Sequence, residues 1–406
     1  MAGAAVAVTG LGLVCPAGIG VPAGWATVCA GEPAAARDPE LAGNPVDISC
    51  RVPGFDPAAL LGARRARRLD RFVQLALVAA REAVTDAGLD PTGWDGARVG
   101  VVLGCTTGGP ATVERQHRLL LEEGPGQVSP QLLPMQLSNM VAGIVGMEFG
   151  ARGPNLVVAT ACASGATAIG VARDLLALDR CDVVLTGGSE AMLTPLVMAG
   201  FAQMGALSRR LDDPAAASRP FDVDRDGFVG GEGAGILVLE RPVDARARGA
   251  RARALVRGFG ASADAHHVTA PDPAGRGFEL AVRAALADAG AGPGDIDHVN
   301  AHGTSTPLND VTEARVLRRV LGERPLVTST KGVTGHCLGA AGAVEAVLTV
   351  LTVEHGLVPP TANLTRLDPE VPVEVAAKPT PLRVDLALSN SLGFGGQNAA
   401  LVIGAA

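Results

Sequence analysis

Short apolar runs recur along the chain and alternate with longer stretches in which apolar residues follow a helical period. The runs predict strands at residues 6–9, 99–103, 156–159, 182–185, 235–239, 299–301 and 386–389. Strands that are apolar throughout are typical of parallel sheets covered by helices on both faces. The pattern therefore predicts an α/β fold in which most strands are parallel.

A short internal repeat indicates that this fold is built from two halves. The helical stretch Arg81–Gly88 (REAVTDAG) resembles Arg283–Gly290 (RAALADAG), which lies 202 residues further along a chain of 406. Each stretch precedes a polar turn and an apolar run that ends in a Gly- and Thr-rich segment. We expect a duplication, with one half at residues 1–248, the other at 249–406, and the join within 240–258.

One cysteine lies where chemistry is favoured. Cys162 is part of VVATACASGATAIG, between an apolar run and a stretch of small residues that predicts a helix over 163–178. At such a strand-to-helix turn the sulfur faces the positive end of the helix dipole, which favours the thiolate. The small neighbours leave room for a large reactant. The turn alone also allows the alternative of a buried structural cysteine.

Composition narrows the classes of partner and site. The 34 basic and 41 acidic residues give a net charge of −7, which argues against general binding to nucleic acid or to an anionic membrane. Seven cysteines without a C-x-x-C pair predict neither a disulfide framework nor a metal site. The first residues lack the features of a signal peptide or a membrane span. We therefore expect a cytoplasmic protein.

Four turns rich in Gly, His and Asn follow apolar runs. They are TACASG around Cys162, NAHGTSTP around His302, KGVTGHCLGAAGAVE from Lys331 to Glu345, and SNSLGFGGQN from Ser389 to Asn398. The chain has only two lysines, Lys331 and Lys378, and otherwise uses arginine. Lysine in the third turn indicates a need for a compact ammonium, and Glu345 is a candidate partner for it.

In this order and spacing, the four turns resemble those of condensing enzymes, specifically the elongating type II (FabF-like) β-ketoacyl-acyl-carrier-protein synthases. RDGFVGGEGAGILVLE (225–240) matches as well, and the resemblance runs from VAVTGLG to the end of the chain. It implies a thiolase-like fold, a five-layered αβαβα sandwich of two duplicated halves. It also implies a dimer and an acyl carrier protein as partner, with no cofactor beyond the phosphopantetheine on that carrier.

The same resemblance implies a role for each residue of the turns. Cys162 would take the acyl chain from its carrier thioester. His302 and His336 would assist decarboxylation of malonyl carrier protein and stabilise the enolate, and Lys331 would orient or charge the site with Glu345. These residue types suit the chemistry, because a thiolate attacks thioesters readily and paired imidazole donors stabilise an oxygen as its charge develops.

Further residues match substrate-binding positions of the family. Phe394 would gate the acyl tunnel, and its backbone N–H would join that of Cys162 in an oxyanion hole. Thr304, Thr306 and Thr269 would form hydrogen bonds to the phosphopantetheine arm. In some relatives a structural monovalent cation is bound at the positions of Asn300, Glu345, Ser389 and Asn390.

Two features of the acyl tunnel bear on the substrate. Thr107 stands where fatty-acid relatives commonly have a bulky apolar residue, and Leu392 replaces an aromatic residue frequently found before the gate. Phe201 matches an apolar wall position. Because a buried hydroxyl without a partner costs about 1 to 3 kcal/mol, Thr107 favours longer or functionalised chains unless it bonds its own backbone. The motifs themselves do not separate fatty-acid from polyketide assembly.

A basic cluster is the candidate surface for an acidic carrier protein. GARRARRLDRF brings Arg64, Arg65, Arg67, Arg68 and Arg71 within eight residues of an otherwise acidic chain. Arg64, Arg67 and Arg68 are the docking candidates, and a solvated helix face is the alternative. Gly205 stands where relatives often carry a further basic residue.

Other classes explain the sequence less well. A degradative thiolase would place a second cysteine near the C-terminus, where SNSLGFGGQN has none. An initiating synthase would pair cysteine with one His and one Asn, and a non-condensing chain-length factor would lack the nucleophile. A cysteine protease would leave Lys331 and a second histidine turn unexplained. A ketosynthase subunit that acts beside a chain-length-factor partner remains the main alternative to a homodimeric synthase.

Overall fold

The computed structural model describes residues 5–406. Its larger strands are β1 (Val6–Cys15), β5 (Val99–Gly104), β6 (Asn155–Val158), β7 (Val183–Glu190), β8 (Gly233–Glu240), β9 (Ala254–Ala263), β10 (His298–Asn300), β11 (Leu326–Thr328), β14 (Leu386–Gly393) and β15 (Gln397–Gly404). Its larger helices are α1 (Val21–Ala30), α4 (Arg71–Asp86), α5 (Pro110–Glu123), α7 (Met140–Phe149), α8 (Ser164–Ala177), α11 (Arg276–Ala289), α12 (Pro307–Leu321) and α14 (Ala341–His355). Short pairs, β2 (Gly18–Ile19), β3 (Ala36–Arg37) with β4 (Ile48–Ser49), and β12 (Leu357–Val358) with β13 (Thr380–Pro381), lie at the edges.

The two halves repeat one topology. The first half has the strand order β1-β8-β7-β5-β6 and the second has β9-β15-β14-β10-β11. If the larger strands of each half are counted in chain order, their order in the sheet is first, fifth, fourth, second and third in both halves. Helices α4 and α11 contain the two stretches of the repeat predicted from the sequence. Helix α4 covers the first sheet, and α11 covers the second sheet in the corresponding place.

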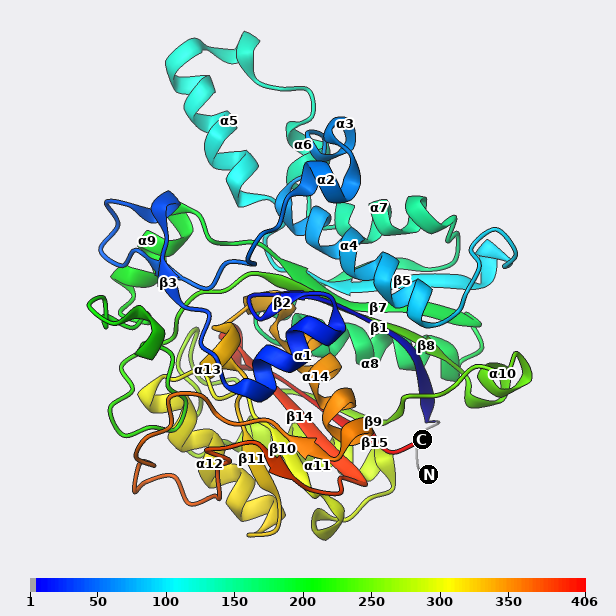
Figure 1. Ribbon diagram of the computed structural model, residues 1–406, viewed down its shortest axis with the longest axis vertical. Coiled ribbons are helices and arrows are strands. Elements are labelled where there is room, and N and C mark those ends of the chain that lie inside the picture. The colour runs from blue at the N-terminus through cyan, green and yellow to red at the C-terminus, as the bar shows by residue number, and fades with distance from the viewer. Residues whose placement is uncertain (1–4) are drawn as a thin grey trace.

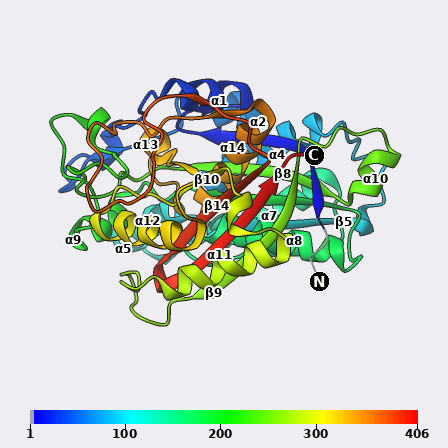
Figure 2. The same cartoon turned by 90° about the horizontal axis from the view of Figure 1, so that it is seen from below.

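Five layers result, stacked from top to bottom in Figure 1. Helices α4 and α7 cover the outer face of the first sheet, and α11 and α12 cover the outer face of the second, as Figure 2 shows from below. Between the sheets lie α8 and α14, whose residues Ile169 and Val347 belong to one core with Leu237 and Leu401 of the facing strands. The structure confirms the αβαβα sandwich.

The strand directions differ from the prediction of a mainly parallel sheet. Only β5 with β6 and β7, and β10 with β11 and β14, are parallel; β8 and β15 return antiparallel to their neighbours. The two halves also join edge to edge, because Val6 to Val8 pair with Val256 to Ala254. The sheets are therefore mixed. All seven predicted strands exist, and β9, β11 and β15 were missed.

One apolar stretch, Leu338–His355, is long enough to span a bilayer, with a mean hydropathy of 1.3. Of its residues, 89% are buried, because the stretch forms the central α14 and the turn before it, between the two sheets. The stretch is thus a core helix.

Helices α5 and α6 (Leu132–Gln136) project from the top of the molecule beside α2 (Pro57–Leu61) and α3 (Ala63–Ala66), as Figure 1 shows.

Candidate active site

The nucleophile candidate lies in a strained turn at the start of a central helix. Cys162 follows β6 and precedes α8, and Ala161 before it has a φ of 48°. Few side chains adopt this left-handed backbone, which is common where function holds a residue in place. Ser164 fixes the turn, because its hydroxyl donates to the Ala161 carbonyl at 2.6 Å and accepts from the Thr160 N–H at 2.9 Å.

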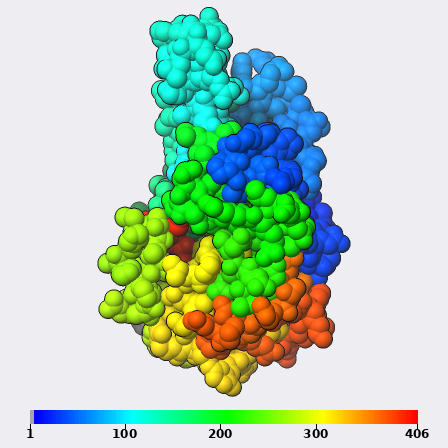
Figure 3. All heavy atoms as spheres, turned by 90° about the vertical axis from the view of Figure 1, so that its left-hand side faces the viewer, coloured from blue at the N-terminus to red at the C-terminus, as the bar shows by residue number. Residues whose placement is uncertain are grey.

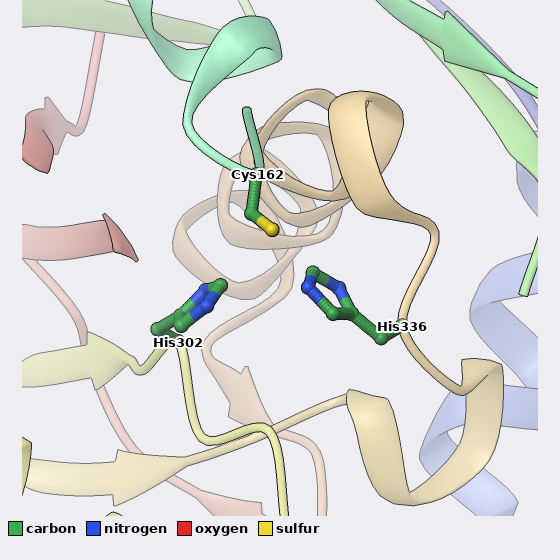
Figure 4. A group of neighbouring side chains, drawn as sticks. All are labelled: Cys162, His302 and His336. Carbon is green, nitrogen blue, oxygen red and sulfur yellow. The ribbon is translucent and has the colours of Figure 1, made fainter. Parts of the chain in front are cut away.

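Two histidines of the other half face this cysteine (Figure 4). His302 follows β10, and His336 follows α13 (Lys331–Thr334); both are 3% exposed. Their rings lie 5.2 Å apart at 84°, and the sulfur and one nitrogen of each ring are within 4.8 Å of one another. The structure therefore brings together the three residues that the motifs singled out.

Each histidine is held from behind by backbone hydrogen bonds, His302 by its own half and His336 by the first half. The backbone N–H of His302 and that of Gly303 donate to the two oxygens of Glu313, at 2.7 and 2.8 Å. The backbone of His336 is bonded to the strand-like segment at Val229, with an N···O distance of 2.8 Å, and its ring packs edge-on against Phe228. Rigid backbone anchors fix where the ring nitrogens point.

Both imidazoles are neutral. Burial, followed by the charge of Lys331, lowers the pKa of His302 and of His336 well below the usual value. Lys331 is buried, forms an ion pair with Glu345, and has its Nζ 3.5 Å from Nδ1 of His302. Burial raises the pKa of Glu345 to about 7, against the opposing effect of the ammonium. Neutral rings can donate one N–H each and accept a proton.

The resting cysteine is a thiol, which corrects the expectation that the helix dipole favours the thiolate. Burial raises the pKa of the Cys162 thiol to about 11 and outweighs the lowering effects of Lys331 and of a hydrogen bond from the Phe394 backbone N–H. A helix N-terminus contributes only about 0.3 to 2 kcal/mol, or about one pKa unit. The sulfur therefore needs a base at the moment of attack.

The centre opens into a cavity of about 570 Å³. All the predicted substrate-binding residues line it: Thr107, Phe201, Thr269, Thr304, Thr306 and Phe394. Figure 3 shows the hollow, with red C-terminal atoms at its bottom between green, yellow-green and yellow segments. Phe394 packs 6.4 Å from Phe201 between ring centres, and the Thr304 and Thr306 hydroxyls are 2.9 Å apart. Lys331 and Glu345 lie behind the histidines.

The Thr107 hydroxyl is not an unpartnered group, so one premise of the sequence argument is wrong. It donates to Glu190 at 3.2 Å, and in the single chain Thr107 is exposed. Glu190 at the end of β7 also accepts the backbone N–H of Thr106 at 2.8 Å and the Thr106 hydroxyl. Burial raises the pKa of this carboxyl. Glu190 thus fixes the loop that forms this end of the cavity.

Glu190 and Glu313 are site residues that sequence reasoning missed. Both are fully buried carboxylates that accept backbone N–H groups beside the cavity. Burial raises the pKa of Glu313 to about 7. No signal in the sequence separates these two from the other acidic residues, because their role depends on which loops the fold brings to them.

Five buried side-chain oxygens on β10, α14 and β14 have no hydrogen-bond partner among the described residues. They are Asn300 Oδ1, Glu345 Oε2, Ser389 Oγ, Asn390 Oδ1 and Ser391 Oγ. The first four belong to the residues that the resemblance matched to a cation site. Carbonyl, hydroxyl and carboxylate oxygens are the donors that hard cations prefer, so the residues present fit a monovalent cation.

The basic cluster divides into paired and unpaired arginines. Arg65 pairs with Glu148 and Arg71 with Glu232, so these two hold α4 and its surroundings. Arg64, Arg67 and Arg68 on and after α3 are exposed, and among residues 5–406 no ion pair engages them. The free charge of the cluster therefore comes from the three residues named as docking candidates.

A cysteine at a strand-to-helix turn that faces two neutral histidines inside a duplicated αβαβα sandwich defines the thiolase-like condensing enzymes. The chain belongs to the β-ketoacyl synthase family: residues 4–245 match its N-terminal domain and residues 253–365 its C-terminal domain.

Relatives and solved structures agree over the full length. The 3-oxoacyl-[acyl-carrier-protein] synthase 2 of Synechocystis is 44% identical over 98% of this chain and 97% of its own, and that of Vibrio cholerae is 43% identical over 98% of each. The structure titled the ishigamide ketosynthase/chain length factor has a TM-score of 0.92 at 34% identity, with both chains fully covered. A type II polyketide ketosynthase solved with its acyl-carrier protein has a TM-score of 0.90 at 32% identity, also over both full chains.

Proposed function

We propose that the protein condenses an enzyme-bound acyl chain with malonyl-acyl carrier protein, with loss of CO₂. The observation that carries this proposal is the convergence of one thiol and two neutral imidazoles, within 4.8 Å, at the bottom of a single cavity. The named activity of the relatives, 3-oxoacyl-[acyl-carrier-protein] synthase, supports it.

In the first step the acyl chain moves to Cys162. A neutral imidazole takes the thiol proton as the sulfur attacks the thioester carbon, and the carrier thiol leaves with a proton. Negative charge develops on the carbonyl oxygen, where the backbone N–H groups of Cys162 and Phe394 would donate. The hydrogen bond that the Phe394 N–H makes to the sulfur puts this donor at the reacting atom.

In the second step malonyl carrier protein loses CO₂ beside the acylated cysteine. The thioester oxygen becomes an enolate oxygen and accepts hydrogen bonds from His302 and His336, whose rings are set at 84° to each other. The carbon then attacks the acyl carbonyl, the Cys162 thiolate leaves, and a β-ketoacyl carrier thioester is released. Thr304, Thr306 and Thr269, along the cavity, would hold the phosphopantetheine arm.

An acyl carrier protein would dock on Arg64, Arg67 and Arg68. These three are exposed and free of ion pairs among the described residues, so they can bind an acidic partner without breaking a bridge first. The solved ketosynthase in complex with its acyl-carrier protein shows that a relative makes such a complex.

Charge reversal at this surface tests the docking. Arg67→Glu with Arg68→Glu is expected to raise KM for carrier-bound substrate about tenfold or more, less so at high salt, with kcat nearly unchanged. Arg180→Glu with Arg246→Glu is the control. Both residues are exposed and lie outside this cluster, and the two substitutions change the net charge by the same amount. If KM rose equally in both double variants, or did not rise in the first, the cluster would have a role in solubility and not in docking.

A second subunit would complete the cavity. Strand β6 pairs only with β5 and leaves an edge, and Leu156 on it is 44% exposed. Thr107 at the end of the cavity is open in the single chain. A second copy, or a chain-length-factor-like partner, would cover both, and one of the similar structures is a ketosynthase in complex with its chain length factor.

We assign the reaction to the cytoplasm, where the seven free cysteines stay reduced.

The choice between fatty-acid and polyketide assembly depends on the acyl end of the cavity. We propose that Thr107 admits longer or functionalised chains, because its small side chain is held against Glu190 rather than across the tunnel. Thr107→Ile is expected to lower kcat/KM for long or β-oxo carrier thioesters about 10- to 200-fold and to spare short saturated ones. Thr107→Val, which removes the hydroxyl at nearly constant size, separates polarity from space. An unaltered preference for saturated chains in both variants would contradict this reading.

Four of the buried oxygens without hydrogen-bond partners would hold a structural monovalent cation. Asn300, Glu345, Ser389 and Asn390 supply them, and a cation there would compensate the buried carboxylates. We expect the Tm to be higher by several degrees in K⁺ than in choline at equal ionic strength, because the folded state alone forms the site. Asn390→Leu should remove the difference. Equal Tm values for the unaltered protein in both salts would argue against the site.

A further inference from the structure

The three residues of the centre are also a set of metal ligands. Cys162 Sγ and one nitrogen each of His302 and His336 lie within 4.8 Å of one another and point at a common space (Figure 4). Thiolate and imidazole are the donors that Zn²⁺ prefers, at about 2.3 Å for sulfur and 2.0 to 2.1 Å for nitrogen. A tetrahedral ion separates such ligands by about 3.3 to 3.6 Å, so movements of about 1 Å or less close the set.

We propose that the centre without an acyl chain binds a thiophilic divalent cation such as Zn²⁺ through Cys162, His302 and His336, and that the bound cation blocks the cysteine. The fourth position of the ion faces the cavity, where water completes the tetrahedron. Three protein ligands with one open position are also the usual ligand set of catalytic zinc sites, in which water occupies the fourth position.

The charges around the centre suit a dication. One ammonium, Lys331, is buried there with three carboxylates, Glu190, Glu313 and Glu345. Lys331 is already paired with Glu345, which leaves the other two without a basic partner. Lys331 also lies 3.5 Å from Nδ1 of His302, so the other ring nitrogen of His302 is the free donor.

The path to the centre is open to a hydrated cation. The cavity of about 570 Å³ leads to it, and the carboxylates Asp226 and Asp264 line that cavity. Binding exchanges the thiol proton for the metal: an S–Zn bond forms, the S–H bond breaks, and the proton passes to the buffer without any redox change. Because acylation uses the same sulfur, metal and acyl chain exclude each other.

The resting protein, with no carrier protein present, provides the test. Titration with Co²⁺, read by absorption, is expected to show one tetrahedral ion with a thiolate-to-metal charge-transfer band, and Zn²⁺ should displace it. Loss of a ligand should weaken Zn²⁺ binding about 100-fold or more in Cys162→Ala and His336→Ala, since even groups that only orient ligands contribute 10- to 100-fold. Cys29→Ala is the matched control, a partly exposed cysteine in α1.

Two outcomes would overturn the proposal. One is Zn²⁺ binding of equal strength in Cys162→Ala and the unaltered protein; the other is Co²⁺ binding without the charge-transfer band. Alkylation of Cys162 in the folded protein gives a second measurement that does not depend on a variant folding, and it should abolish the band. None of these readings requires condensation activity, so failure here and failure of the proposed function are distinguishable.

Discussion

Replacing Cys162 with alanine is expected to abolish the acyl-enzyme and to lower condensation by at least about 10⁴-fold. Cys162 carries the only thiol among the described residues that line this cavity, and loss of the nucleophile removes the whole pathway through it. Intact-mass measurement after incubation with acyl carrier thioester should show no adduct. Decarboxylation of malonyl carrier protein should persist, because it uses the histidines.

Cys105→Ala controls for a nonspecific effect, since Cys105 is a buried cysteine next to Thr106 of the cavity lining, and its thiol donates to Glu190. It should still acquire the acyl mass. An undiminished adduct in Cys162→Ala would disprove the assignment of the nucleophile.

Removing both histidines is expected to abolish decarboxylation. Each single alanine variant, His302→Ala or His336→Ala, should lower the rate about 10²- to 10³-fold, because each removes one preorganised donor to the enolate oxygen. His302→Asn should lose less, since an amide keeps an N–H donor. Release of CO₂ from malonyl carrier protein measures this step without acyl transfer.

His117→Ala, an exposed position on α5, is the control for this series. If the double variant still released CO₂ at the rate of the unaltered protein, the enolate would be stabilised by other groups, and the role assigned to the rings would be wrong.

Much of the centre was predictable because its residues are confined to short motifs. Cys162, His302 and His336 lie in turns whose glycines and small residues are distinctive, and Lys331 stood out because lysine is so rare in this chain. The α/β class followed from the apolar runs and the duplication from one repeat, whereas the five layers were implied by the family resemblance. Local sequence carries this information because the residues of each motif are close together in the chain.

What was missed depends on contacts between distant segments. The antiparallel return of β8 and β15 is not encoded in their composition, which is as apolar as that of parallel strands. Glu190 and Glu313 act by accepting N–H groups from loops 84 and 11 residues away along the chain. The Cys162 thiol was predicted to be acidic from one helix end, whereas the cost of its burial depends on the whole fold.

The matching topology of the halves gives the cavity a hidden pseudo-symmetry. Thr106 follows the end of β5 by two residues, as His302 follows the end of β10, and β5 and β10 hold the same place in their sheets. Glu190 ends β7, the counterpart of β14, which ends just before Phe394. At these equivalent positions the second half carries the ring of His302 and the gate, whereas the first half carries Thr106 and Glu190, which hold the end wall of the cavity. Because Cys162 comes from the first half and both histidines come from the second, neither half alone contains a complete site, and the activity requires both halves.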